Sequence, residues 1–196
     1  MAAQQQRRWA PLVAGALPPD LAGQTAVMLG WGPIAQTLQP LLSLLGLQVV
    51  VVRRSAQAAA PGVPTVPFTA LQTVLPNADW LLLCCPLNAQ TQGLVDADVL
   101  RQLPRGAQLI NVARGEILVE ADLIAALQSG HLAGAYLDVF EHEPLAAASA
   151  LWALPNLILT PHSAGHSAGN AARVVALFAN NLPRWLSGQP LAHVVR

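Results

Sequence analysis

The chain has few cysteines, few charges and no long hydrophobic segment. Two of its 196 residues are cysteine, 10% are charged and 5% are aromatic. Because Cys84 and Cys85 are neighbours, they cannot form a disulfide framework, and low cysteine use is typical of a reducing compartment. No apolar run approaches the ~20 residues that a membrane-spanning helix needs. This composition argues against a disulfide-rich secreted domain and against a membrane-spanning protein.

Concentrated charge is also missing. Ten basic and ten acidic residues cancel to a net charge of zero, and like charges form no block. Nucleic acid and acidic membrane surfaces are therefore not expected partners. Arg7-Arg8 and the apolar stretch behind it have a slight similarity to an export signal, but Pro11 interrupts that stretch. We expect a cytoplasmic protein.

Apolar residues, in contrast, make up 54% of the chain, which is enough for one buried core. Short apolar runs alternate with segments of helical periodicity. The expected strands are 25–29, 49–52, 80–85, 107–112, 133–139 and 157–160, and the expected helices are 34–46, 96–103 and 119–130. This alternation predicts an α/β fold: a Rossmann-type, doubly wound parallel sheet in three α/β/α layers.

Two further segments complete this prediction. The Ala/Pro-rich stretch 56–67 is expected to be a connection. From Ser167 onward, apolar side chains between Val174 and Trp185 form a helical stripe, which predicts a C-terminal helix. Pro183 should kink or end that helix.

A glycine-rich loop, G-W-G-P-I-A, follows the first expected strand. Gly30 permits a tight turn, and Gly32 lets the backbone approach a pyrophosphate at the positive end of the next helix. Ala35 replaces the usual third glycine and still allows close packing of helix on strand. Pro33 lacks an N–H that could bind phosphate, so we expect somewhat weaker pyrophosphate binding. The loop predicts a dinucleotide site, with Trp31 as a shield for the pyrophosphate.

The end of the second expected strand bears on cofactor choice. NAD-binding proteins usually carry an Asp or Glu there, bonded to the ribose hydroxyls. This chain has Arg53, Arg54 and Ser55 instead, with no acid nearby. Guanidinium groups bind a 2′-phosphate through charge-assisted bonds, so we expect NADP(H) to be preferred, with NAD(H) possible. Two solvated arginines at a strand end are the alternative.

Three short runs behind later strands, N-V-A-R-G, D-V-F-E-H-E-P and T-P-H-S-A-G, each contribute one residue suited to carbonyl reduction. His162 can donate a proton near neutral pH, and Glu143 can favour and orient its imidazolium. Arg114 can bind a substrate carboxylate and polarise the carbonyl. Each residue alone also fits a plain structural role. No metal is expected, because no local ligand spacing accompanies His142 or His162.

Together these runs resemble the D-isomer-specific 2-hydroxyacid dehydrogenases, from about Leu21 to Leu191. The resemblance implies that Arg114 binds substrate, that His162 is the acid/base and that Glu143 supports it. It also places Asp138 at the nicotinamide end of the cofactor. The full set of expected cofactor contacts is Gly30, Trp31, Gly32, Pro33, Ile34, Arg53, Arg54, Ser55, Cys85, Pro86, Thr91, Val112, Ala113, Asp138, His162 and Ala164.

The resemblance further implies a substrate-binding half ahead of the cofactor domain. Only about twenty residues precede Leu21, so we expect residues 1–20 to be the remnant of a connecting helix. Residues 21–166 are then the dinucleotide-binding domain. Residues 167–196 are expected to pack on the missing half, and a homodimer through the cofactor domain is expected by resemblance.

The sequence therefore supports an NAD(P)H-dependent oxidoreductase that reduces a small 2-keto acid to a D-2-hydroxy acid. Arg53 to Ser55 and the stretch 61–64 (P-G-V-P) are most similar to the glyoxylate/hydroxypyruvate reductase branch, which tends to use NADPH. The alternative is a non-catalytic dinucleotide-binding module, or a fragment that is inactive without the substrate-binding half.

Overall fold

The structure is a computed structural model that describes residues 6–7, 9, 17, 19–55 and 57–194. The chain divides between Leu159 and Thr160 into two compact units. The prediction for residues 1–20 falls largely outside the described residues. Among the helices that are described, none combines the length and the apolar character needed to span a bilayer.

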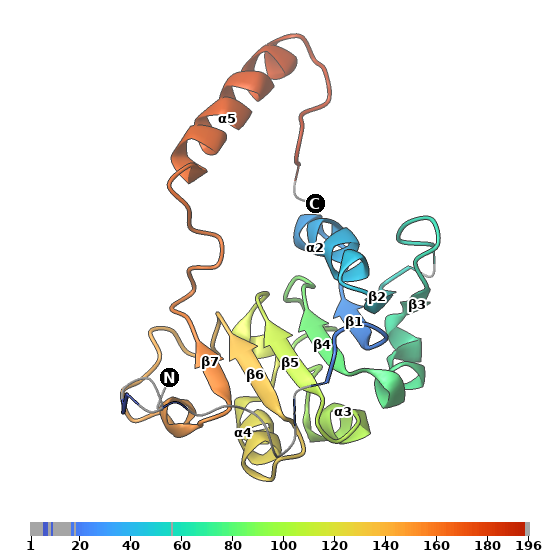
Figure 1. The fold of residues 1–196 in the computed structure, drawn as a ribbon. Coiled ribbons are helices and arrows are strands. Elements are labelled where there is room, and N and C mark those ends of the chain that lie inside the picture. Colours follow the sequence, from blue (N-terminus) through green and yellow to red (C-terminus); the bar gives the residue numbers. More distant parts are fainter. Residues whose placement is uncertain (1–5, 8, 10–16, 18, 56, 195–196) are drawn as a thin grey trace. The chain divides into compact units, whose positions relative to one another are not determined.

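The first unit is built on one seven-stranded sheet in the order β3-β2-β1-β4-β5-β6-β7 (Figure 1). Every pairing in it is parallel. The strands are β1 (Thr25–Leu29), β2 (Gln48–Arg53), β3 (Thr65–Pro67), β4 (Trp80–Leu83), β5 (Gln108–Asn111), β6 (Gly134–Leu137) and β7 (Leu157–Leu159). The predicted Rossmann-type parallel sheet is confirmed.

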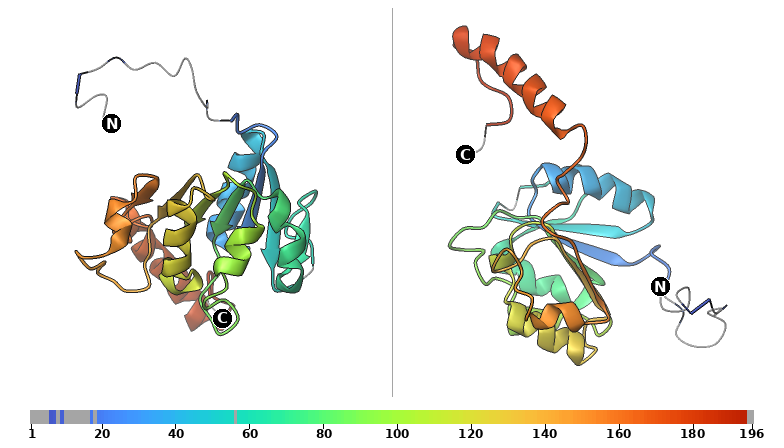
Figure 2. Two further views of the ribbon diagram at one scale, coloured as in Figure 1. Left: turned by 90° about the horizontal axis from the view of Figure 1, so that it is seen from below. Right: turned by 90° about the vertical axis from the view of Figure 1, so that its left-hand side faces the viewer.

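Helices cover both faces of this sheet. Helix α2 (Pro33–Leu44) lies on one face, and α3 (Ala97–Gln102) and α4 (Glu120–Gln128) lie on the other, as both views in Figure 2 show. Along β1, Ala26 and Met28 belong to the core cluster beneath α2, while Val27 and Leu29 belong to the opposite cluster. This alternation explains why β1 is apolar throughout, because successive side chains enter different cores.

The helix ends follow local sequence signals. Asp96 caps α3 by accepting a 3.0 Å hydrogen bond from the Val99 amide. Helix α2 starts with Pro33 and ends just before Gly46, whose φ of 88° few other residues adopt. Short 3₁₀ turns, η1 (Phe68–Thr73), η2 (Leu75–Asn77), η3 (Gly115–Ile117) and η4 (Ala150–Ala153), complete the unit.

One expected connection contains a strand. Within 56–67, residues Thr65–Pro67 form β3, which pairs with the end of β2 at the edge of the sheet. A three-residue strand ending in proline gives no apolar run to detect, and proline is tolerated there because an edge strand has a partner on one side only.

The second unit contains helix α5 (Asn170–Leu186), the expected C-terminal helix. The helix does not end at Pro183 as one alternative expected: it continues through Leu186, and the Ser187 amide bonds the Pro183 carbonyl at 3.0 Å. Because Pro183 lies only three residues before the end of the helix, few hydrogen bonds beyond it are left to disrupt. None of the α5 residues is buried. The expected domain boundary at residues 166 and 167 stays a prediction, and the compact units divide at Leu159 and Thr160.

Candidate active site

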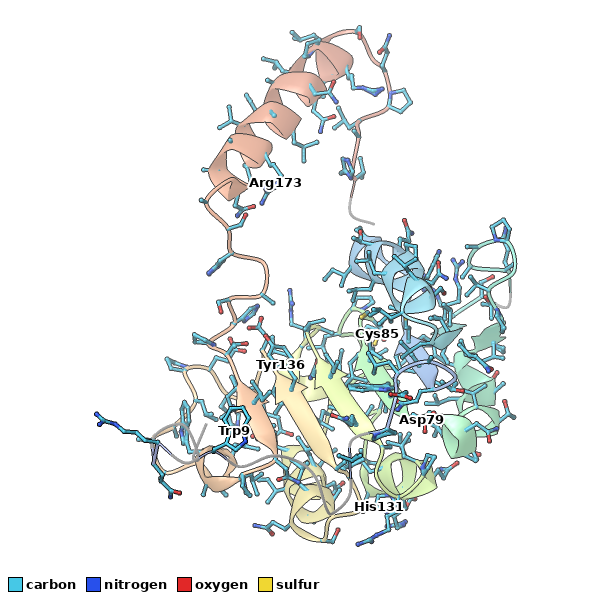
Figure 3. All side chains as sticks on the ribbon, viewed as in Figure 1. Trp9, Asp79, Cys85, His131, Tyr136 and Arg173 are labelled. Carbon is cyan, nitrogen blue, oxygen red and sulfur yellow. The ribbon has the colours of Figure 1, made fainter. Side chains whose placement is uncertain are left out.

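The predicted site residues of the first unit follow the C-terminal ends of five parallel strands. Parallel strands end at a common edge, so the loops after β1, β2, β4, β5 and β6 meet there. Figure 3 labels Cys85 just past the end of β4 and Asp79 just before its start, which marks the two edges of the sheet. Ligands of doubly wound sheets bind at the edge that carries Cys85.

The glycine loop is held by backbone contact. Gly30 has a φ of 105°, and its amide donates a 2.7 Å hydrogen bond to the Val52 carbonyl. A Cβ atom at Gly30 would lie 2.7 Å from the Cys84 carbonyl oxygen and 2.7 Å from the Cys85 backbone. Residue 30 therefore has to be glycine for two independent reasons, conformation and space.

Gly32 differs from Gly30 in having open space. It is the N-cap of α2, no side chain caps that helix end, and a Cβ atom there would have no neighbour within 4 Å. Ala35 is fully buried between helix and sheet, as expected for a residue in the place of the third glycine. Ile34 is 49% exposed, whereas Trp31 packs partly against the core beneath α2. An uncapped helix N-terminus beside open space fits a pyrophosphate.

The arginine segment lies at the end of β2. Arg53 is the last residue of that strand and is partly buried, and Arg54 and Ser55 are exposed. Neither guanidinium group forms a hydrogen bond or ion pair within the described part of the chain. Both arginines thus stand at the edge where an adenosine ribose is expected, with their donors available.

The loop after β4 is closed by its own threonine. The buried Thr91 hydroxyl donates to the Pro86 carbonyl and accepts from the Asn88 amide, each at 2.8 Å. Burial raises the pKa of the Cys84 and Cys85 thiols to about 11, so both are protonated at neutral pH. Protonated thiols are weak nucleophiles, so both cysteines are unreactive packing residues, and the hydrogen bonds of Thr91 shape the loop.

The buried side chain of Asn111 shapes the loop that carries Arg114. Its carboxamide oxygen accepts from the Ala113 amide, and its nitrogen donates to the Arg114 carbonyl, each at 3.0 Å. These two bonds satisfy a buried polar group and fold the backbone outward. Arg114 is exposed, and its guanidinium donates to the Ala113 carbonyl at 2.6 Å. Val112 and Ala113 lie between the strand and the arginine.

The loop after β6 carries Asp138 and Glu143. Asp138 is 2% exposed, and its amide continues the strand ladder by donating to the Asn111 carbonyl at 3.0 Å. Glu143 is exposed, and its Oε1 accepts a 3.0 Å hydrogen bond from the Phe140 amide. The Glu143 carboxylate therefore closes its own loop through backbone bonding, which the motif alone did not predict.

His162 belongs to the second unit, as does Ala164. Its φ is 50°, in the left-handed region that residues other than glycine rarely adopt, and its amide donates to the Thr160 carbonyl at 3.0 Å. The meeting of His162 with Arg114 and Glu143 stays a prediction. Among the described residues no group of three or more His, Cys, Asp or Glu side chains is arranged to hold a metal ion.

Sequence reasoning missed three residues that build these loops. Asn111 is the first residue of the N-V-A-R-G run, and that position could have drawn attention to it. A buried asparagine side chain needs hydrogen-bond partners, which here are in the loop that follows. Glu120 and Glu141 bond each other's backbone amides across 21 positions of sequence, and no local pattern indicates such a pairing.

Comparison with known proteins agrees with this architecture. Residues 1–164 match the family model of the D-isomer specific 2-hydroxyacid dehydrogenase NAD binding domain. An (S)-sulfolactate dehydrogenase of Chromohalobacter salexigens is 39% identical over 168 residues, which are 85% of this chain and 54% of that protein. A glyoxylate reductase of Thermococcus kodakarensis is 31% identical over 170 residues, 87% of this chain and 51% of that protein. The chain thus spans about half the length of these relatives.

Solved structures give the same result. A probable 2-hydroxyacid dehydrogenase from Rhizobium etli in complex with NADP has a TM-score of 0.88 and 34% identity. The match covers 100% of this chain and 61% of the Rhizobium etli chain. A D-isomer specific 2-hydroxyacid dehydrogenase from Xanthobacter autotrophicus in complex with NADPH has a TM-score of 0.86 and 37% identity. That match covers 100% of this chain and 78% of the Xanthobacter autotrophicus chain. This chain belongs to the D-isomer-specific 2-hydroxyacid dehydrogenase family and corresponds to its NAD-binding domain.

Proposed function

We propose that this chain supplies the cofactor site and the catalytic side chains of an NADPH-dependent reductase of a small 2-keto acid. The observation that carries the proposal is the common sheet edge where the uncapped α2 N-terminus, the Arg53 segment and the loops of Arg114 and Glu143 all lie. Relatives named glyoxylate reductase and hydroxypyruvate reductase support the substrate class. The family resemblance also supports a homodimer.

The bound dinucleotide supplies the hydride that the keto carbon receives. Arg114 pairs with the substrate carboxylate and fixes its orientation. His162 donates a proton to the carbonyl oxygen, so the product is a hydroxyl group, and Glu143 stabilises the imidazolium before that transfer. The left-handed backbone of His162 supports this role, because such conformations in residues other than glycine cluster at active sites.

A preference for NADPH is proposed from the arginine segment. Arg53 and Arg54 have no acidic neighbour in the loop, and two of the similar structures carry NADP or NADPH. Losing a charge-assisted bond of ~1.5–3 kcal/mol weakens binding by roughly tenfold or more. We therefore expect Arg53→Ala and Arg54→Ala each to weaken NADPH binding by about tenfold and NADH binding by less than about twofold.

The experiment titrates NADPH and NADH into the purified chain by nucleotide fluorescence. Arg101→Ala is the matched control, because this arginine lies on α3 with its side chain 69% exposed. The second arm measures NADPH oxidation with glyoxylate and with hydroxypyruvate. His162→Ala should lower turnover by roughly 10²–10⁴-fold with NADPH affinity kept. NADPH binding without turnover that depends on His162 would instead identify a dinucleotide-binding module, and a preference for NADH would exclude the arginine argument.

A further inference from the structure

Two carboxylates join the start of helix α4, which follows the Arg114 loop and η3, to the loop of Glu143. The Glu141 amide donates a 2.7 Å hydrogen bond to Glu120 Oε1, and the Glu120 amide donates a longer one, 3.4 Å, to Glu141 Oε1. Each carboxylate therefore binds the backbone of the residue that carries the other. Both side chains are partly buried. We call this reciprocal pair the carboxylate clamp.

The clamp closes beside a direct backbone contact. A Cβ atom at Gly115 would overlap the carbonyl group of Phe140 and the amide nitrogen of Glu141. The two loops consequently touch at Gly115 with no side chain between them. Gly115 follows Arg114 directly, and Glu141 precedes Glu143 by two positions. Whatever holds this contact also holds together the backbone segments that carry the two candidate catalytic side chains.

The clamp lies at the N-terminus of helix α4. Glu120 is the first residue of α4, and the amide that Glu141 accepts from belongs to the first turn of that helix. The positive end of a helix stabilises nearby negative charge, typically by 0.3–1 kcal/mol. The N-terminus of α4 is therefore a favourable place for the two acidic side chains of the clamp.

We propose that Glu120 and Glu141 are positioning residues that hold the Arg114 loop and the Glu143 loop in one fixed arrangement. This inference rests on the proposed function for its catalytic consequence. The link to Glu143 is specific: the Glu143 carboxylate accepts from the Phe140 amide, and Phe140 precedes Glu141 in the clamp. Opening the clamp should loosen that bond while leaving the glycine loop after β1 unchanged.

The test compares Glu120→Ala with Glu120→Gln, because the Glu120 carboxylate accepts the shorter, 2.7 Å bond of the clamp and glutamine keeps an acceptor oxygen at the same position. Displacing a reacting group by ~1 Å costs about 100-fold in rate, so Glu120→Ala should lower kcat/KM for the keto acid by roughly 10- to 100-fold. NADPH affinity should stay within about twofold, and the Gln variant should recover most of the activity. Glu116→Ala is the matched control, because that glutamate lies in η3 and its side chain forms no hydrogen bond within the described ranges.

Hydrogen exchange of the Phe140 amide gives a readout that needs no turnover. We expect it to accelerate by roughly tenfold or more in Glu120→Ala and to stay unchanged in Glu120→Gln and Glu116→Ala. Unchanged Phe140 exchange would overturn the clamp. Lower thermal stability with normal kcat/KM would overturn its positioning role. If the unsubstituted chain shows no turnover, the proposed function fails for this chain, and exchange alone decides whether the clamp exists.

Discussion

The loop after β1 and the loops after β5 and β6 share one sheet edge but are held in different ways. Around Gly30 the backbone itself makes the contacts, and no side chain caps the helix that follows. Around Arg114 and Glu143, the side chains of Asn111, Glu120, Glu141 and Glu143 bind backbone amides. One region leaves its backbone donors available, and the other uses them to fold its loops.

This difference matches what each region is proposed to bind. A pyrophosphate is bound by backbone N–H groups, so side chains that capped them would compete with the ligand. A keto acid is to be bound by side chains, whose aim depends on rigid loops, so the backbone there is tied down. Both regions nevertheless depend on one glycine at a direct backbone contact, Gly30 in the first and Gly115 in the second.

The largest expected effect is at Gly115. In Gly115→Ala the new Cβ atom would overlap the Phe140 backbone, which cannot rotate away as a side chain can. We expect a loss of about 4 kcal/mol or more in the free energy of unfolding, or a chain that does not fold. Denaturant unfolding measures it, with Gly32→Ala as control. A loss below ~1 kcal/mol would show that the two loops separate easily and that the contact does not define the site.

A smaller effect is expected at the other glycine contact. Gly30→Ala combines a φ of 105° with a Cβ atom 2.7 Å from the Cys84 carbonyl oxygen. Left-handed backbone costs roughly 1–2 kcal/mol for alanine before any clash is counted, so we expect a loss of about 3 kcal/mol and no measurable NADPH binding.

Gly32→Ala separates binding from folding at the same loop. The added Cβ atom meets no protein atom within 4 Å, so stability should change by less than about 0.5 kcal/mol. It would enter the open space proposed for the pyrophosphate, so NADPH affinity should still fall at least tenfold. Unchanged affinity in Gly32→Ala would place the dinucleotide elsewhere and break the comparison between the two regions.

Sequence patterns predicted the sheet well because the side chains of each buried strand pack into the hydrophobic clusters on both faces of the sheet. The runs at 25–29 and 49–52 are apolar on both faces, which distinguishes them from loop sequences. The structure confirms both predicted strands as β1 and β2. Strand β3 was missed because three residues ending in Pro67 have no such signature. The extension of α5 beyond Pro183 was unexpected for a related reason: proline indicates a break, not where the helix finally stops.

The candidate binding and catalytic residues could be predicted from the sequence, but most of the residues that hold their loops in place could not. Gly30, Arg114 and Glu143 lie in recognisable runs that follow parallel strands. The carboxylate clamp could not be found in the same way, because Glu120 and Glu141 are ordinary surface-type residues until the fold brings their backbones together. The positions of His162 relative to Arg114 and Glu143 remain predictions for the same physical reason, since spacing along a chain does not fix a contact between units.

The smallest expected effect concerns Cys84 and Cys85, which lie against Gly30. Burial raises the pKa of each thiol from 9.0 to about 11 in the folded chain. The unfolded chain loses these protons first, so the stabilisation is complete below pH 9 and is lost as the pH rises through 11. At pH 10 we expect a loss of about 1 kcal/mol for each thiol relative to pH 8. Urea unfolding at the two pH values measures it.

The composition of the chain makes the two thiols the main groups that change charge in this alkaline test. The chain has no lysine and a single tyrosine, Tyr136, so few other groups change charge between pH 8 and 10. A Cys84→Ala/Cys85→Ala variant loses some packing at every pH, but its pH dependence should shrink, whereas Tyr136→Phe should keep most of it. If the double variant retained the full alkaline loss, the thiols would not be its source, and the burial of both side chains behind the glycine loop would not hold in solution.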